Sequence, residues 1–183
     1  MQTEKYNDKY RQDVQYVCLK TGPDEAPYDE RVGTYILNCY CNYYIDWETN
    51  NCFVLTDNDK AVGYVLCAPY YKKYRQKSAD YIKTAKKYAG KDRNEIRAEQ
   101  FALRLFSKKY PAHLHIDILE QYTGKGSGTA LMKTLLGHLK NTGVKGVMLI
   151  VGSGNKEAQR FYSRLGFKTK INAFGAKVMA MKL

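Results

Sequence analysis

This chain of 183 residues has no long apolar run. A membrane-spanning helix needs about 20 consecutive apolar residues, and the first five residues, Met-Gln-Thr-Glu-Lys, lack the apolar region of a secretion signal. We therefore expect a soluble, cytoplasmic protein that does not enter a membrane. A chain of this length can bury roughly 70% of its unfolded surface without disulfides. One core suffices, and we predict a single domain over residues 1–183.

The cysteines are few, odd in number and without a Cys-x-x-Cys pair. They are Cys18, Cys39, Cys41, Cys52 and Cys67. Without a secretion signal, this set favours reduced, buried thiols over disulfides. Cys39 and Cys41 could suggest metal or redox chemistry, but the residues between and beside them supply no further soft ligand. We predict no metal site.

Acidic residues are also scarce. There are 18 Asp and Glu against 30 Lys and Arg, which gives a net charge of +12. Such a charge favours anionic partners such as phosphates, an acidic acceptor or nucleic acid. Most of the excess lies in residues 70–109, where thirteen basic residues stand against four acidic ones.

Residues at about 70–111 are predicted to form a helical insertion rather than a second domain. Ile96, Leu103, Phe106 and Tyr110 recur at near-helical spacing, and ~40 residues seldom hold a core alone. Its charge has three interpretations: a solvated helix face, a lid that attracts an acidic acceptor or phosphates, or a nucleic-acid surface. On such a surface, bases would stack on tyrosines among the lysines, namely Tyr70, Tyr71, Tyr74, Tyr81 and Tyr88.

The remaining elements follow from apolar periodicity and turn residues. Before the insertion, we predict helices over residues 6–20 and 31–44 and a β-hairpin of residues 52–56 and 61–67. After it, we predict a strand over 113–119, a helix from Ser127 that ends at Gly143, a strand over 145–151, a helix over 155–165, and a final hairpin of 168–172 and 177–182. A strand before the first helix is barely visible.

The most informative segment is the loop Gln-Tyr-Thr-Gly-Lys-Gly at residues 121–126, between a strand and a helix. Gly124, Gly126 and Gly128 can adopt dihedrals closed to other residues, and they let a ligand approach the main chain. The first N–H groups of the helix have no intrahelical partners. Each amide bonded to an ionised oxygen contributes ~1.5–3 kcal/mol, against ~0.3–1 kcal/mol from the helix dipole. The loop therefore predicts an anion site suited to a pyrophosphate.

Spacing separates this loop from two other phosphate-binding motifs. A P-loop needs Gly-x-x-x-x-Gly-Lys-[Ser/Thr], but Lys125 is followed by Gly126, and no glycine lies five residues before Gly124. A Rossmann fingerprint needs a third Gly or Ala where Thr129 or Leu131 stands, and no carboxylate ends the next strand. What remains is [Gln/Arg]-x-x-Gly-x-[Gly/Ala], which residues 121–126 match without a gap.

With this motif, the chain resembles the GNAT superfamily of N-acetyltransferases, which bind acetyl-CoA. A second recurrent stretch of that superfamily is matched by Leu149-x-Val151-x-x-x-Asn155-x-x-Ala158-x-x-Phe161-Tyr162-x-x-Leu165-Gly166-Phe167. The chain also resembles an acetyltransferase-like domain that is found in some bacteria and is also fused to certain O-GlcNAc hydrolases. This likeness rests on His-Leu-His-Ile-Asp-Ile at residues 113–118, on the basic insertion before it and on Cys-Leu-Lys-Thr-Gly at residues 18–22.

The resemblance implies a fold and an activity. The fold would be of the α/β (α+β) class, with a mixed, mostly antiparallel central sheet flanked by helices and splayed at the coenzyme-binding strand. The activity would be acetyl transfer from acetyl-CoA directly to a primary amine. Two other functions remain open: a coenzyme A-binding domain without transferase activity, and a basic nucleic-acid-binding module. The sequence does not identify the acceptor, which could be acidic, and it leaves a homodimer open.

If the loop binds coenzyme A, we expect different residues to contact different parts of the ligand. Main-chain groups of Ile118 and Leu119 would contact the pantetheine arm. The pyrophosphate would lie on the amides of Gln121, Tyr122, Thr123, Gly124, Lys125 and Gly126, and Ser127, Gly128 and Thr129 would complete the site. By resemblance, Asn155 and Ala158 also contact the coenzyme. Asn155 can equally cap a helix by accepting from an N–H near Glu157 or Ala158.

Three residues are candidates for proton transfer. By resemblance, Tyr162 donates a proton to the departing thiolate, and a phenol of ordinary pKa ≈ 10 holds that proton at neutral pH. On the strand, His113, His115 and Asp117 alternate onto one face, which we expect to line the acceptor cleft. Asp117 is the first candidate for the base that deprotonates the amine, and His115 the second; either could instead be a hydrogen-bonded structural group.

Overall fold

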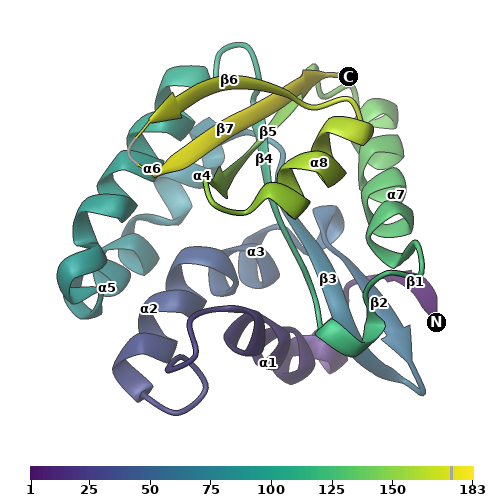
Figure 1. The fold of residues 1–183 in the computed structure, drawn as a ribbon, viewed down its shortest axis with the longest axis horizontal. Coiled ribbons are helices and arrows are strands. Elements are labelled where there is room, and N and C mark those ends of the chain that lie inside the picture. Colours follow the sequence, from purple (N-terminus) through teal and green to yellow (C-terminus); the bar gives the residue numbers. More distant parts are fainter. Residues whose placement is uncertain (174) are drawn as a thin grey trace.

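The computed structural model describes residues 1–173 and 175–183, and within them one seven-stranded sheet forms in the order β1-β2-β3-β4-β5-β7-β6 (Figure 1). The strands are β1 (Gln2–Lys5), β2 (Phe53–Asp57), β3 (Lys60–Ala68), β4 (Ala112–Ile118), β5 (Gly146–Gly152), β6 (Lys168–Ala173) and β7 (Ala176–Lys182). The α-helices are α1 (Arg11–Thr21), α2 (Glu30–Tyr40), α3 (Asn42–Trp47), α4 (Tyr71–Lys77), α5 (Ala79–Tyr88), α6 (Arg93–Phe106), α7 (Ser127–Asn141) and α8 (Lys156–Arg164).

The sheet is mostly antiparallel. β4 and β5 form a parallel pair, and the other neighbouring strands run antiparallel. The connection between β4 and β5 is the predicted glycine loop followed by α7, as a parallel pair requires a crossover. The mixed α/β sheet flanked by helices that the resemblance implies is confirmed.

β4 and β5 separate soon after they meet. Their paired residues are Ala112 with Val147 and His113 with Met148. Beyond these two pairs, β4 continues along β3 as far as Ile118, while β5 continues along β7 as far as Gly152. Figure 1 shows the two strands running apart from their shared end. The sheet is therefore splayed at the strand where the sequence resemblance implied it.

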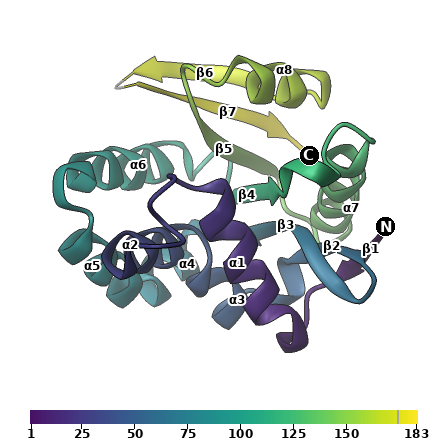
Figure 2. The ribbon, with the colours of Figure 1, turned by 60° about the horizontal axis from the view of Figure 1, so that its bottom comes forward.

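The two faces of the sheet carry different helices and separate hydrophobic clusters. Helices α1 to α6 pack on one face, against residues such as Tyr64, Leu66 and Met148. Helix α7, with part of α8, packs on the other face against Leu114, Val147 and other strand residues. Figures 1 and 2 both show α5 and α6 at one side of the molecule and α7 at the opposite side.

The predicted insertion forms α4, α5 and α6. Their apolar side chains join the cluster that also holds α1 and α2, and they include Tyr74, Ile82, Ala85, Ile96 and Leu103. The helices therefore share a core with the sheet. The basic residues lie on the outside: of the thirteen, all except Lys86 are exposed.

Most predicted elements occur close to the expected positions, with three corrections. The helix predicted over residues 31–44 is broken at Cys41, whose backbone (φ −131°, ψ −67°) is not helical, so α2 and α3 are separate. The first helix begins at Arg11, after a single 3-10 turn at Asp8–Tyr10. A strand that the sequence hardly indicated, β1, pairs with β2 from Gln2 to Lys5.

Two further findings concern composition. Among the described residues, no helix combines the length and apolarity needed to cross a bilayer. All five cysteines are buried and none is in a disulfide.

Gly63 of β3 allows β4 to approach closely, and its substitution tests this contact. A Cβ on Gly63 would lie 2.8 Å from Cγ1 of Ile118 and 3.1 Å from the carbonyl oxygen of Asp117. We expect Gly63→Ala to lower the free energy of unfolding by ~1–3 kcal/mol because of this overpacking, measured by urea denaturation. Gly137→Ala, in an open helical position of α7, is the control and should stabilise by ~0.5–1 kcal/mol. Equal effects of the two substitutions would contradict the packing argument.

Candidate functional site

The glycine loop adopts the conformation that an anion site requires. Gly124 (φ +75°) and Gly126 (φ +79°) are left-handed, and no heavy atom of the described residues lies within 4 Å of a Cβ built on either. Gly126 is the N-cap of α7, and the Ala130 N–H is bonded to its carbonyl. The N–H groups of Ser127, Gly128 and Thr129 precede that first intrahelical bond and are available to a ligand. The predicted dihedrals of Gly124 and Gly126 are thus confirmed.

Gly128 differs from the other two glycines in its backbone. It lies inside α7 and has no positive φ, so it does not use the dihedrals that are open to glycine alone. A Cβ on Gly128 would instead lie 3.3 Å from Cζ of Phe161 and 3.7 Å from Cδ1 of Ile118. The absence of a side chain lets the start of α7, the end of β4 and α8 meet at one point.

At the end of β4, main-chain groups point alternately to the two edges of the strand. The N–H of Leu119 bonds to the carbonyl of Val62 at 3.0 Å, and the carbonyl of Leu119 accepts from the N–H of Tyr122. By alternation, the main-chain groups of Ile118 and Ile116 face the opening between β4 and β5. Both main-chain groups of Leu119 are therefore already hydrogen-bonded, whereas those of Ile118 face away from β3. The coenzyme contact of these two residues stays a prediction.

Asn155 caps α8. Its side-chain oxygen accepts from the Ala158 N–H at 3.0 Å, so the predicted N-cap is confirmed. The side-chain amide nitrogen of Asn155 is not needed for this bond, and the residue is exposed. It can donate to a ligand while the cap is in place.

Tyr162 lies on α8 between two aromatic rings. Its ring centroid is 5.2 Å from that of Phe161 and 6.0 Å from that of Phe167. Burial raises the pKa of Tyr162, and the negative charge of Asp117 raises it further. A phenol with a raised pKa keeps its proton at neutral pH, as a proton donor must.

Asp117 is held by a residue that the sequence analysis missed. The hydroxyl of Tyr64, on β3, donates to Oδ2 of Asp117 at 2.6 Å. The two residues are directly opposite each other in the β3–β4 register. Burial raises the pKa of Asp117, while the hydrogen bond from Tyr64 opposes the rise. The carboxylate is thus a stronger base than an exposed aspartate.

His115 and His113 share the face of β4 that carries Asp117. Nε2 of His115 is 3.0 Å from the hydroxyl of Tyr44, and burial lowers the pKa of His115 to about 4. His113 is 1% exposed, neither ring nitrogen has a hydrogen-bond partner among the described residues, and burial lowers its pKa to about 3. Of the residues expected to line the acceptor cleft, His115 and Asp117 line cavities, whereas His113 is enclosed beside the rings of Tyr74 and Tyr44.

Two cavities share Tyr40 and His115 as lining residues. One, of about 200 Å³, is lined by these residues, Asp117 and the segment that ends α1. The other, of about 450 Å³, lies between α6 and strands β5 to β7, and Glu99 lines it. Tyr40 and Glu99 were missed by the sequence analysis. The helical spacing of the sequence could have placed Glu99 on the face of α6 that lines the cavity. The residues of that face are Glu95, Ala98, Glu99, Ala102, Leu105 and Phe106.

The tyrosines of the insertion do not form a row of exposed aromatic rings. Tyr74 is 1% exposed, and Tyr71, Tyr81 and Tyr88 pack against the core. Tyr70 is 48% exposed. This arrangement removes four of the five expected stacking partners for a nucleic acid.

Comparison with known proteins agrees with this geometry. A sequence model described as "Acetyltransferase (GNAT) family" matches residues 19–167. This chain belongs to the GNAT family. The membership predicted from the glycine loop and the second motif is confirmed, and the family uses acetyl-CoA as its acyl donor.

Two solved structures resemble the GNAT chain over nearly its whole length. The crystal structure of SsHAT covers 99% of this chain and 97% of its own, with a TM-score of 0.84 and 29% sequence identity. PaiA N-acetyltransferase from Thermoplasma acidophilum, solved in complex with coenzyme A, covers 100% and 98%, with a TM-score of 0.62 and 14% identity. At that identity, the second likeness shows the fold alone.

The curated relatives match the GNAT chain over shorter stretches. Protein O-GlcNAcase of Rattus norvegicus is 27% identical over 129 residues, which cover 63% of this chain and 14% of the relative. An uncharacterised N-acetyltransferase of Methanocaldococcus jannaschii is 41% identical over 64 residues, or 34% of this chain and 28% of that protein. The chain thus spans a small part of the length of the O-GlcNAcase that it resembles. Among the described residues, no group of three or more His, Cys, Asp or Glu could hold a metal ion.

Replacement of Tyr64 by Phe should raise the pKa of Asp117 further. The phenol donates a hydrogen bond that stabilises the charged carboxylate, and its loss favours the protonated form. Carbon NMR of the aspartate carboxyl groups would place the titration midpoint at a higher pH. Tyr44→Phe removes an equally buried phenol that contacts His115 instead, so the Asp117 midpoint should not move. A midpoint unchanged in Tyr64→Phe would contradict the assigned role of Tyr64.

Proposed function

We propose that this chain is an acetyl-CoA-dependent N-acetyltransferase that moves the acetyl group directly to a primary amine. One observation carries the proposal: the start of α7 with its free amides, the end of β4 at Ile118, and α8 at Phe161, the residue before Tyr162, meet at Gly128. The first two bind a phosphorylated, amide-containing ligand, and the third supplies a proton. Membership of the GNAT family supports the same assignment.

Different residues would bind the pyrophosphate and the pantetheine arm of the coenzyme. Amides of Gln121, Gly124, Lys125 and Gly126, with those of Ser127, Gly128 and Thr129, would hold the pyrophosphate, because charge-assisted bonds to main-chain N–H groups are strong. The N–H groups of Tyr122 and Thr123, also expected to bind it, already donate to the carbonyls of Leu119 and Glu120. Lys125 adds a positive charge at the exposed loop. Main-chain groups of Ile118 would bond the pantetheine arm in the gap between β4 and β5, and Asn155 and Ala158 would contact it from α8.

Bound acetyl-CoA would supply an activated thioester. The transfer forms a bond from the amine nitrogen to the acetyl carbon and breaks the carbon–sulfur bond, so one proton must leave the amine and one must reach the sulfur. An ammonium with pKa ≈ 10.4 loses its proton at pH 7.4 at a cost of ~4 kcal/mol. Asp117, whose pKa is raised by burial, is the proposed acceptor of that proton. Tyr162 is the proposed donor to the thiolate.

His115 is a weaker candidate for the base than Asp117. Its pKa of about 4 makes the neutral imidazole a poor proton acceptor at pH 7. Its ring nitrogen is also engaged with the hydroxyl of Tyr44. We assign His115 to the wall of the acceptor site, beside Asp117 in the same cavity.

A turnover screen tests the proposed activity. Purified protein is mixed with acetyl-CoA and a panel of primary amines, and released thiol is measured. The proposal expects amine-dependent thiol release and a product heavier by one acetyl group. Normal acetyl-CoA binding with no release for any amine would instead support the coenzyme-binding domain without transferase activity. Binding that tracks oligonucleotides rather than the coenzyme, and falls steeply with salt, would support the nucleic-acid module.

Gly126→Val should weaken coenzyme A binding at least about tenfold. A β-branched residue at φ +79° is strained by ~1–2 kcal/mol, and its side chain would stand where the ligand meets the amides. Isothermal titration calorimetry measures the Kd. Gly143→Val is the matched control, because Gly143 is also left-handed (φ +76°) but follows the far end of α7. Equal loss of affinity in both variants would show a stability effect rather than a binding effect.

Tyr162→Phe should lower kcat by roughly 10²–10⁴-fold, the range for loss of a positioned proton donor. The Kd for acetyl-CoA should change little, since the ring remains. Steady-state thiol release with the best amine of the panel measures the effect. Tyr16→Phe, on the exposed side of α1, should behave as the parent. Unchanged turnover in Tyr162→Phe would remove Tyr162 from the mechanism.

A further inference from the structure

The larger cavity contains an acidic residue that the transfer chemistry does not use. Glu99 of α6 is part-buried, and the hydroxyl of Tyr40 donates to its Oε2 at 3.3 Å. None of the salt bridges formed by the described residues includes Glu99. Most of the cavity wall is apolar, with Ala102 on α6, Ile150 on β5 and Val178 on β7. A carboxylate in such surroundings gains from a cationic partner.

The cavity reaches the place where the sheet opens. Its lining includes His115 of β4 and Ile150 of β5, which lie on the two strands just beyond their last paired residues. His115 and Tyr40 also line the smaller cavity that contains Asp117. The rings of Tyr40 and His115 are in edge contact at 5.1 Å between centroids. A molecule in the larger cavity would therefore lie next to Tyr40 and His115, which also line the smaller cavity of Asp117, the proposed base.

We propose that the cavity between α6 and strands β5 to β7 is the acceptor site, and that Glu99 with Tyr40 selects a positively charged small primary amine with an apolar body. This inference rests on the proposed transferase function. The volume of about 450 Å³ suits a small molecule. The apolar walls would hold the body of the amine, and Glu99 would pair with its ammonium group before the proton is lost.

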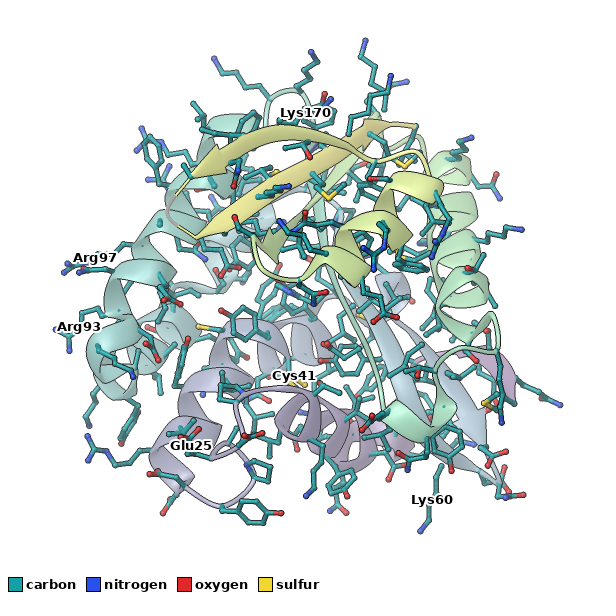
Figure 3. All side chains as sticks on the ribbon, viewed as in Figure 1. Glu25, Cys41, Lys60, Arg93, Arg97 and Lys170 are labelled. Carbon is teal, nitrogen blue, oxygen red and sulfur yellow. The ribbon has the colours of Figure 1, made fainter. Side chains whose placement is uncertain are left out.

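This assignment departs from the acidic acceptor that the net charge suggested. No arginine of α6 lines the cavity, and Figure 3 shows Arg93 and Arg97 projecting outward from the helix. Glu95 and Glu99, in contrast, line the cavity. Burial raises the pKa of Glu99 to about 7, the hydrogen bond from Tyr40 opposes the rise, and the charge of Glu95 adds to it. At pH 8, the carboxylate form predominates.

Two substitutions test the charge and the shape of the site at pH 8. With 2-phenylethylamine as the probe, Glu99→Gln should raise the KM for the amine at least about tenfold, as expected for loss of a partly buried ion pair. Ala102→Phe, which fills the cavity, should raise that KM to a similar extent but should alter the KM for methylamine little. Neither variant should change the Kd for acetyl-CoA. Asp59→Asn, in the exposed β2–β3 turn, removes one charge far from the cavity and is the control.

The outcomes separate this inference from the proposed function. If neither substitution affects turnover, the cavity is not the acceptor site, and the proposed transferase function is unaffected. The acceptor site would also be overturned if lysine-containing peptides were acetylated at equal rates by the parent and both variants. If no amine is turned over, binding of 2-phenylethylamine is followed by NMR. Binding lost in Glu99→Gln would support the site even though the proposed function had failed, and no binding to the parent would overturn the site.

Discussion

The parting of β4 and β5 is the constraint on which the rest of the site depends. After two residue pairs, the strands follow different partners, and the main-chain groups of Ile116 and Ile118 face a gap. A buried N–H or C=O without a partner costs ~1–3 kcal/mol, so such a gap is tolerated where water or a polar ligand reaches it. The start of α7 and α8 meet the end of β4 on one face of the sheet. On the other face, the α6 cavity is lined by residues of both strands, His115 and Ile150.

Tyrosines from other elements surround the polar side chains on β4, of which His113 is buried and His115 and Asp117 are part-buried. Tyr64 of β3 bonds to Asp117, Tyr44 of α3 bonds to His115, and Tyr40 of α2 lies against the same imidazole. A tyrosine provides an apolar ring for packing and one hydroxyl for a buried partner. This combination lets β4 carry a carboxylate and an imidazole in part-buried positions that line the two cavities. It also sets their pKa values, since burial acts in opposite directions on an acid and a base.

The sequence predicted the parts of the site that depend on neighbours along the chain. The left-handed conformations of Gly124 and Gly126 and the cap at Asn155 are local, and their prediction is confirmed. The partners of Asp117 and His115 come from 53 and 71 residues away, and no pattern along the chain connects them. The strand β1 was barely visible in the sequence for a related reason: Gln-Thr-Glu-Lys has no apolar alternation, and its pairing with β2 makes it a strand.

The insertion shows why the net charge of a segment is a poor guide to the charge of a cleft beside it. Two unit charges 4 Å apart interact by about 1 kcal/mol in bulk water and by about 4 kcal/mol near a protein at an effective dielectric constant of 20. Exposed charges are also screened over about 8 Å at physiological salt. The basic residues of α4 to α6 lie almost entirely in solvent, whereas Glu99 lies in an apolar cavity. For a ligand inside that cavity, one or two carboxylates at contact distance outweigh a much larger number of distant, solvated cations.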